Sequence, residues 1–413
     1  MLKKMVYLSI LLSLISANVL SIDLVFMQLS LFRISLLFTL LLVILNIAKK
    51  GYLSLTKLKQ EKAIQFFLIW FIYSIISVIW VKDYSAWLKY GFFLGSGLIG
   101  IIIINEQLIT RNHLLAALKY FSVMIIIHNL IGWFEIFGGT YFFLQERSRV
   151  FYEMEKMPVS MFGNANDYAT FLLLSMSILY ILMRHSRNKV LKLIYATTFL
   201  SSTVLIILTK SRANMIGIAV WLITLVLLNF RKSKTKLALV IMIFCVIIIL
   251  IAYPSVFTNL VDFNFIDVQG SEVIRVNLLL NGFDFFISTF GFGVGAGNIE
   301  YWMQNYGVRY TRGVTNIHNW WFEILVANGV IIFIGYMNFY VDMIIKFYRK
   351  FKRSLSLEDK TISLGFLCSL FSFIIGSISS SSIISSEWLW MYWGILIAFK
   401  GLPLETRKNK GAI

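Results

Sequence analysis

Long runs of apolar residues without a single charged side chain constrain this fold more than any other feature. Residues 5–22, 63–80 and 237–253 are three such runs. Each is near the ~20 residues that a helix needs to cross a ~30 Å hydrocarbon core. The runs do not alternate apolar and polar residues, as the strands of a membrane barrel do. They therefore predict membrane-spanning α-helices.

The composition agrees with a membrane protein. Hydrophobic residues make up 59% of the 413-residue chain and charged residues 14%, whereas soluble domains carry about 25% charged residues. The two cysteines, Cys245 and Cys368, both lie inside apolar runs. We therefore expect neither a disulfide framework nor a thiolate metal site. No acidic cluster indicates a metal site in the sequence, and no cofactor is expected.

We predict an all-α, polytopic integral membrane protein with about 12 transmembrane helices, forming a single membrane domain over residues 1–413. The N-terminal Met-Leu-Lys-Lys before an apolar run resembles a signal peptide. No small-x-small cleavage site follows it, so we interpret this run as an uncleaved first span. The predicted spans lie near residues 5–22, 24–47, 63–80, 86–104, 114–137, 166–183, 191–208, 212–229, 237–253, 318–345, 361–378 and 385–399.

Basic residues indicate how the chain is oriented in the membrane, because Lys and Arg accumulate in the connections on the cytoplasmic side. Most of the 38 Lys and Arg residues fall in alternate short connections, which lie on one side with this span count. Both termini are therefore predicted to be cytoplasmic, in a bacterial cytoplasmic (inner) membrane. The net charge of +18 then mainly reflects the basic connections on the cytoplasmic side, and nucleic acid is not an expected partner. The basic connections are residues 3–4, 49–62, 111, 184–192, 231–236, 346–360 and 400–410.

Two connections on the opposite side are long, roughly residues 138–165 and 254–317. Long loops in compact proteins are usually functional or disordered. The second is rich in Gly, Asn, Trp and Tyr. We expect residues 254–317 to form a large, structured extracytoplasmic loop before the tenth span.

Basic residues in the outer segments are informative because membrane topology does not require them. Guanidinium groups bind phosphate oxygens through a planar fork, so outward-facing arginines suit a lipid-linked phosphate or diphosphate. The alternative is that they pair with Glu272, Asp262 or lipid headgroups. The candidates are Lys210, Arg212, Arg275, Arg309 and Arg312.

His318 lies where the long outer loop enters a span. The positive end of a helix disfavours an imidazolium there. A neutral imidazole could accept a proton from a hydroxyl near pH 7. The alternative is a helix-capping or interfacial histidine beside tryptophans of an aromatic belt.

Other polar features have simpler interpretations. Residues 291–298 match a loose G-x-G-x-x-A pattern, but no βαβ unit surrounds them, so we predict only a tight turn where backbones approach closely. Residues 164–167 are good helix caps. Arg33, inside the second span, is either functional or reaches the surface. His128 is expected to be a satisfied interior residue, and the serines at 379–382 an outer loop or packing surface.

Taken together, these segments resemble the O-antigen ligase and Wzy-type polysaccharide polymerase superfamily of polytopic membrane proteins. Residues 162–169 look like the family's Asn-Pro-Asn segment, although Ala165 stands where the family often has proline. Thr209-Lys210-Ser211-Arg212 looks like its Ser-Arg turn.

The remaining likeness lies in and after the long outer loop. Arg275, with residues 277–286 and 291–298, looks like the family's second arginine and glycine-rich turn. His318-Asn319, with Glu323 and Gly329 on the same span, looks like its His-Asn signature. The likeness covers roughly residues 160–340, and the first third of the chain shows nothing diagnostic.

The resemblance implies metal-independent glycosyl transfer at the outer face of the membrane, from a glycan linked to undecaprenyl diphosphate. Arg212 and Arg275 would hold the diphosphate as it leaves, and His318 would take the proton from the acceptor hydroxyl. The expected enzyme polymerises capsular, O-antigen or teichuronic-acid-type repeat units in the lipid bilayer, beside a flippase and a chain-length regulator. Further substrate-binding residues would be Lys210, Asn319, Arg309, Arg312 and Asn166.

Three alternatives stay open. An O-antigen-type ligase would move the glycan to a different acceptor. A flippase or other transporter would have a similar number of spans, with polar residues and broken helices at mid-membrane in both halves. A non-catalytic membrane scaffold is the third.

Overall fold

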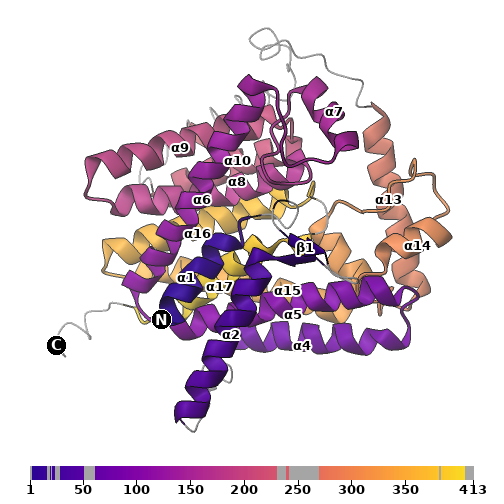
Figure 1. Ribbon diagram of the computed structural model, residues 1–413, viewed down its shortest axis with the longest axis horizontal. Helices are drawn as coiled ribbons and strands as arrows, with labels where there is room; N and C mark the ends of the chain where they lie inside the picture. The colour runs from indigo at the N-terminus through magenta and orange to yellow at the C-terminus, as the bar shows by residue number, and fades with distance from the viewer. Residues whose placement is uncertain are drawn as a thin grey trace. The chain divides into compact units, whose positions relative to one another are not determined.

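The computed structural model describes residues 2–15, 19, 21–23, 28–50, 61–229, 239–240, 269–380 and 383–404. Within these ranges the chain is almost wholly helical (Figure 1). The elements are α1 (Leu2–Leu12), β1 (Ser21–Asp23), β2 (Gln28–Ser30), α2 (Leu31–Lys50), α4 (Lys62–Ile76), η1 (Ser77–Ile79), α5 (Tyr84–Gln107), α6 (Arg111–Gly138), α7 (Glu146–Glu155), α8 (Ala165–His185), α9 (Lys189–Leu208), α10 (Arg212–Asn229), α13 (Gln269–Ser288), α14 (Ile299–Tyr306), α15 (Trp320–Arg353), α16 (Leu357–Gly376), η2 (Ile383–Ser385) and α17 (Glu387–Gly401).

Eight helical segments in the described ranges are long and apolar enough to cross a membrane. They coincide, within a few residues at each end, with eight of the predicted spans, from 63–80 to 212–229 and then 318–345 and 361–378. The expected multi-pass helical membrane protein is thus confirmed, while the number twelve and the cytoplasmic termini stay predictions. The span near 237–253, except residues 239–240, and residues 254–268 of the outer loop lie outside the described residues.

The first two predicted spans differ from the structure. α1 ends at Leu12, and β1 and β2 pair as a short antiparallel hairpin where the spans 5–22 and 24–47 were expected to meet. The Ser13 hydroxyl donates to the Ile10 carbonyl at 2.7 Å, immediately after the helix. Serine and asparagine side chains compete with helical hydrogen bonds, and such residues are frequent between 13 and 30. Because this stretch contains few charged residues, the sequence alone does not show where the helix ends.

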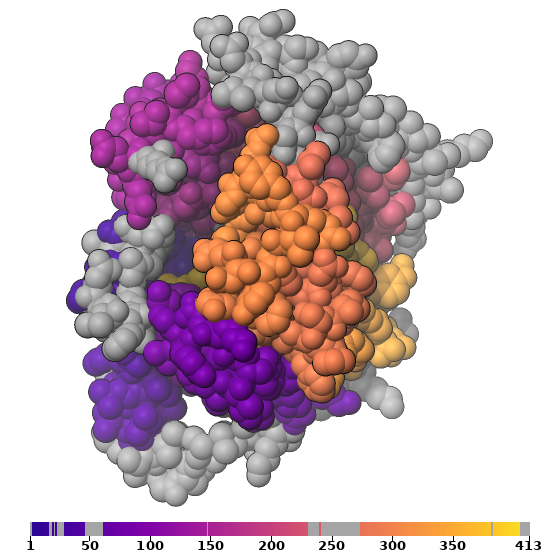
Figure 2. Space-filling model, turned by 90° about the vertical axis from the view of Figure 1, so that its right-hand side faces the viewer, coloured from indigo at the N-terminus to yellow at the C-terminus, as the bar shows by residue number. Residues whose placement is uncertain are grey.

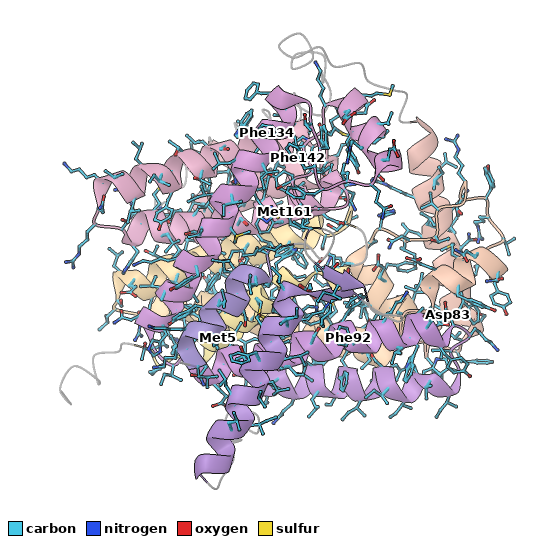
Figure 3. All side chains as sticks on the ribbon, in the orientation of Figure 1. Met5, Asp83, Phe92, Phe134, Phe142 and Met161 are labelled. Carbon is cyan, nitrogen blue, oxygen red and sulfur yellow. The ribbon has the colours of Figure 1, made fainter. Side chains whose placement is uncertain are left out.

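The chain forms two compact units. Unit 1 comprises residues 1–120, 267–343 and 381–402, and in it α5 packs against α17, α4, α2 and α1. Unit 2 comprises residues 121–266, 344–380 and 403–413, and in it α8 packs against α9 and α16, with α10 against α16. In unit 2, the ring of Phe134 on α6 stacks on Phe142 with centroids 5.5 Å apart (Figure 3).

In unit 1, α15 is broken at Gly329, whose φ of 75° and ψ of 177° are not helical. The backbone of the glycine-rich turn fills this break. A Cβ on Gly293 would lie 2.6 Å from the Gly329 nitrogen, so only glycine fits there. The predicted tight turn is therefore present, and it supplies hydrogen bonds that the broken helix lacks: Val294 N–H to Val326 O (2.8 Å), Gly295 N–H to Ala327 O (3.0 Å) and Val330 N–H to Gly291 O (3.0 Å).

Candidate active site

The described part of the large outer loop packs around its own apolar cluster in unit 1. α13 and α14 enclose this cluster together with the start of α15. Figure 2 shows the surface of α13 and α14 lying directly against that of α4 and α5. The packing fixes the point where the chain enters α15. The buried members are Leu278, Phe285, Val294, Met303, Ile317 and Val326.

His318 lies at this entry point, between the buried residues Ile317 and Trp320. Its side chain is half-buried, and its backbone N–H donates to Asn316 Oδ1 at 2.8 Å. Burial lowers the pKa of His318 from 6.5, and the positive charge of Arg275 lowers it further. The imidazole is therefore neutral near pH 7, the form that can accept a proton.

The geometry of α13 explains why Arg275 acts on His318. Arg275 and Gly282 are seven residues apart, so they share one face of the helix. A Cβ on Gly282 would meet Phe322 at 2.8 Å and Ile317 at 3.0 Å, so this face packs closely on the start of α15. The exposed guanidinium of Arg275 is thereby directed to the region of His318. The structure brings these two predicted site residues together.

Asn319 caps α15. Its Oδ1 accepts the N–H of Phe322 at 3.3 Å, and its carbonyl accepts the N–H of Glu323 at 2.8 Å. Asparagine is among the preferred residues at helix N-termini for this reason. The side chain thus has a structural role next to His318, and the predicted contact with substrate stays a prediction.

A polar stripe on α13 holds the loop that carries Arg309 and Arg312. The Asn277 amide donates to the Tyr310 carbonyl at 2.9 Å. The buried Asn281 both donates to the Arg309 carbonyl and accepts its N–H, each at 2.9 Å. Arg309 also pairs with Asp284. This pairing differs from the acidic partners considered from the sequence. Arg312 is exposed.

The sequence led to no individual prediction for these α13 residues, although their spacing carries a signal. Asn277, Asn281 and Asp284 follow a spacing of four and then three residues, which places them on one helical face. Such a polar stripe in an otherwise apolar helix indicates a face that binds a neighbouring segment. Here it positions the arginine loop.

In unit 2, Arg212 begins α10 immediately after the tight turn that ends α9, and its side chain is exposed. The turn rests on buried hydroxyl and amide groups. Asn214 Nδ2 donates to Ser211 Oγ at 2.9 Å, and Ser211 Oγ lies 3.3 Å from Ser379 Oγ. Thr170 Oγ1 lies 2.6 Å from Ser380 Oγ. Satisfied buried polar networks rigidify the elements that they join, so this network fixes the base of the Arg212 turn.

Ser379 and Ser380 therefore belong to a packing surface, one of the two roles predicted for residues 379–382, of which 381–382 lie outside the described residues. Residues 164–167 are the predicted cap: Asn164 Oδ1 accepts the N–H of Asp167 at 2.9 Å. Asn166 contributes its carbonyl to the same network, accepting from Thr170 Oγ1 at 3.0 Å. Its predicted binding of substrate stays a prediction.

Lys210 forms an ion pair inside unit 2. Its Nζ lies 2.6 Å from Glu155 Oε2, with side-chain exposures of 16% and 10%. Glu155 is the last residue of α7, in the first long outer connection. The pair ties that connection to the Arg212 turn.

Three predicted site residues have strained backbones. Lys210, Arg312 and His318 have φ values of 56°, 53° and 54°, and they are among six non-glycine residues with positive φ in the described ranges. Such conformations cost about 1–3 kcal/mol each and concentrate at functional sites. These three predicted site residues thus share a left-handed backbone conformation, which the sequence does not reveal.

The buried ionisable residues outside these clusters are held by protein groups. In unit 1, Arg33 Nε lies 2.7 Å from Glu387 Oε1, and its guanidinium lies over the rings of Phe92 and Phe93. Arg33 is therefore buried in an ion pair and does not reach the surface. In unit 2, His128 Nδ1 lies 2.9 Å from Ser160 Oγ, as expected for a satisfied interior histidine.

Two comparisons with known proteins found similar sequences. Residues 196–337 match the family model described as O-antigen ligase. This segment runs from α9 into α15 and contains Arg212, Arg275 and His318. The chain is also 29% identical over 364 residues to the teichuronic acid biosynthesis protein TuaE of Bacillus subtilis (strain 168), covering 85% of this chain and 74% of that protein.

These two matches support the predicted similarity to the O-antigen ligase and polymerase superfamily. This similarity supports a role in polysaccharide biosynthesis in a membrane, as the sequence resemblance predicted. It does not distinguish a polymerase from a ligase. The roles of the individual site residues stay predictions.

Proposed function

We propose that this protein polymerises undecaprenyl-diphosphate-linked oligosaccharide repeat units at the outer face of the bacterial cytoplasmic membrane. The observation that carries the proposal is the half-buried His318 imidazole, whose pKa is lowered, beside the Arg275 guanidinium at the start of α15. A neutral imidazole is a proton acceptor, and a guanidinium binds phosphate oxygens. General base and diphosphate ligand are the two groups that this transfer needs.

In the proposed step, His318 accepts the proton of an acceptor sugar hydroxyl. The hydroxyl oxygen forms a bond to the anomeric carbon of the donor glycan. The bond between that carbon and the diphosphate oxygen breaks, and undecaprenyl diphosphate leaves with the electron pair. Arg275 and Arg212 stabilise the negative charge that develops on the leaving group. No metal ion is required in this scheme, because the two guanidinium groups neutralise the diphosphate.

The test is complementation of a strain that lacks this protein. Wild type is compared with His318→Ala, Arg275→Ala and Arg212→Ala at matched membrane levels. Arg353→Ala, an exposed arginine in the last turn of α15, is the control. Polymer length is followed on gels, with lipid-linked units measured alongside. We expect the three site variants to lose long chains and to accumulate single lipid-linked units outside.

Other outcomes identify the alternatives. Long lipid-linked chains that fail to reach their final acceptor would favour a ligase, the activity in the name of the matched family model. Single units retained inside would favour a flippase. Normal ladders in all three variants would contradict the mechanism and favour transport or a scaffold.

A further inference from the structure

A cavity of about 390 Å³ lies in unit 1, formed by segments that the predicted topology places outside. The first turns of α5, the first turns of α15, α14 and η2 line it. Figure 3 shows Asp83, which is part of the lining, beside α14. The volume is within the ~300–1,000 Å³ typical of pockets for small ligands. The proposed mechanism does not use it.

The lining combines aromatic rings with hydrogen-bonding groups. Trp320 and Tyr301 provide rings, while Glu323, Glu300 and Gln304 provide carboxylate and amide groups. Glu323 is only 6% exposed, whereas Glu300 and Gln304 are exposed to solvent. Such a surface can pack on the C–H face of a sugar ring and bind its hydroxyls.

Charge selects among the possible ligands. Asp83, Glu300 and Glu323 contribute three carboxylates to the lining, and Lys89 is its one basic residue. This excess of negative charge repels phosphate and uronate groups. The donor sugar is attached to a diphosphate, which needs the cationic surroundings of the arginines. The acceptor sugar needs only to present a hydroxyl to His318, two residues before Trp320 in the lining.

We propose that this cavity binds an uncharged sugar residue of the acceptor glycan, held by the Glu323 carboxylate and Gln304 amide against Trp320 and Tyr301. The inference rests on the proposed function for the identity of the acceptor. Binding itself can be measured without transfer. The cavity then orients the acceptor chain so that its terminal hydroxyl reaches His318.

The test uses the full-length protein in lipid nanodiscs. The probe is the lipid-free oligosaccharide released by mild acid from the host's own lipid-linked repeat units, titrated calorimetrically. Glu323→Gln and Gln304→Ala should each weaken its binding by about tenfold, the size expected for one lost hydrogen bond to a well-held group. Asn305→Ala is the matched control, because Asn305 is exposed on the same helix and is not part of the lining. His318→Ala should bind the probe normally and transfer nothing.

The outcomes separate the two proposals. If Glu323→Gln and Gln304→Ala bind the oligosaccharide as tightly as wild type, the cavity inference is overturned, even where His318 proves essential for polymerisation. If both variants lose binding but His318→Ala still polymerises, the cavity binds sugar and the proposed mechanism is wrong. Weaker binding by the Asn305→Ala control, at the level of Gln304→Ala, would also overturn the inference.

Discussion

At the residue scale, two effects act on His318 in the same direction. Its burial removes water that would stabilise an imidazolium, and Arg275 repels the positive charge. Both favour the neutral form, so the pKa lies below the usual 6.5. A base with this property stays competent at lower pH than an exposed histidine does.

The first prediction concerns the pH dependence of transfer. Because only the neutral imidazole accepts a proton, the rate should fall on acidification, with its midpoint below pH 6.5. Arg275→Gln should reduce the rate and also move this midpoint to higher pH, since the repulsion is gone. Initial rates across pH with lipid-linked substrate in nanodiscs measure both. Arg353→Gln, at an exposed arginine in the last turn of α15, is the control. An unmoved midpoint in Arg275→Gln would contradict the coupling.

The second prediction concerns the buried pair of Arg33 and Glu387. Removing one partner of a buried ion pair leaves an unpaired charge and costs about 3–5 kcal/mol. Arg33→Met should therefore lower the unfolding temperature markedly, because Glu387 and its neighbour Ser30 stay behind. The double variant Arg33→Met/Glu387→Leu should recover most of the loss. Thermal unfolding in one detergent measures this, and a double variant no more stable than Arg33→Met would refute it.

At the scale of elements, α7 acts on the Arg212 turn through the pair of Glu155 and Lys210. The third prediction is that Glu155→Lys reduces transfer about ten- to a hundredfold, because displacement of a group by 1 Å can have that effect. The double variant Glu155→Lys/Lys210→Glu should restore most of the rate if Lys210 only supports the turn. Failure of the double variant, with normal folding, would instead assign Lys210 to the substrate. Complementation at matched expression measures the rates.

The glycine-rich turn and the break in α15 form one structural unit, because the backbone of the turn hydrogen-bonds to α15 on both sides of the break. The fourth prediction is that Gly293→Ala destabilises the protein by more than about 3 kcal/mol, since strain at φ 83° adds to a backbone clash. Gly313→Ala is the matched control, with φ 77° and open space around it. It should cost only about 1–2 kcal/mol. Thermal unfolding of both variants measures the difference, and equal losses would show that the clash is relieved.

The contact between the glycine-rich turn and α15 is an example of a feature that the sequence could not predict. The eight long apolar helices that coincide with predicted spans follow from apolar length alone, and the tight turn follows from closely spaced glycines. That the turn inserts into a helix broken at Gly329 depends on contacts between distant segments. The pairs of Lys210 with Glu155 and Arg33 with Glu387 are equally long-range, so no local pattern predicts them.

At the scale of the whole molecule, the broken helix bears on the transporter alternative. A transporter was expected to show broken helices in both halves, with backbone groups that coordinate a solute or ion. Within the described residues, Gly329 is the one residue with a non-helical backbone inside a long helix. The loop 291–297 occupies that break with its own backbone. The break therefore serves to join the outer loop to α15.

The last prediction tests the topology across the residues that the structure does not describe. Arg187 is exposed before α9 and is predicted to be cytoplasmic, whereas Tyr310, 78% exposed, is predicted to lie outside. In the predicted topology α9 and α10 provide two crossings between these positions, and the run at 237–253 provides the third. In a background with Cys245→Ala and Cys368→Ala, a membrane-impermeant maleimide should label Tyr310→Cys in intact cells and Arg187→Cys only after permeabilisation. Equal labelling of both in intact cells would mean an even number of crossings. In that case the run at 237–253 would not span the membrane, and the siding of His318 relative to the basic connections would have to be reversed.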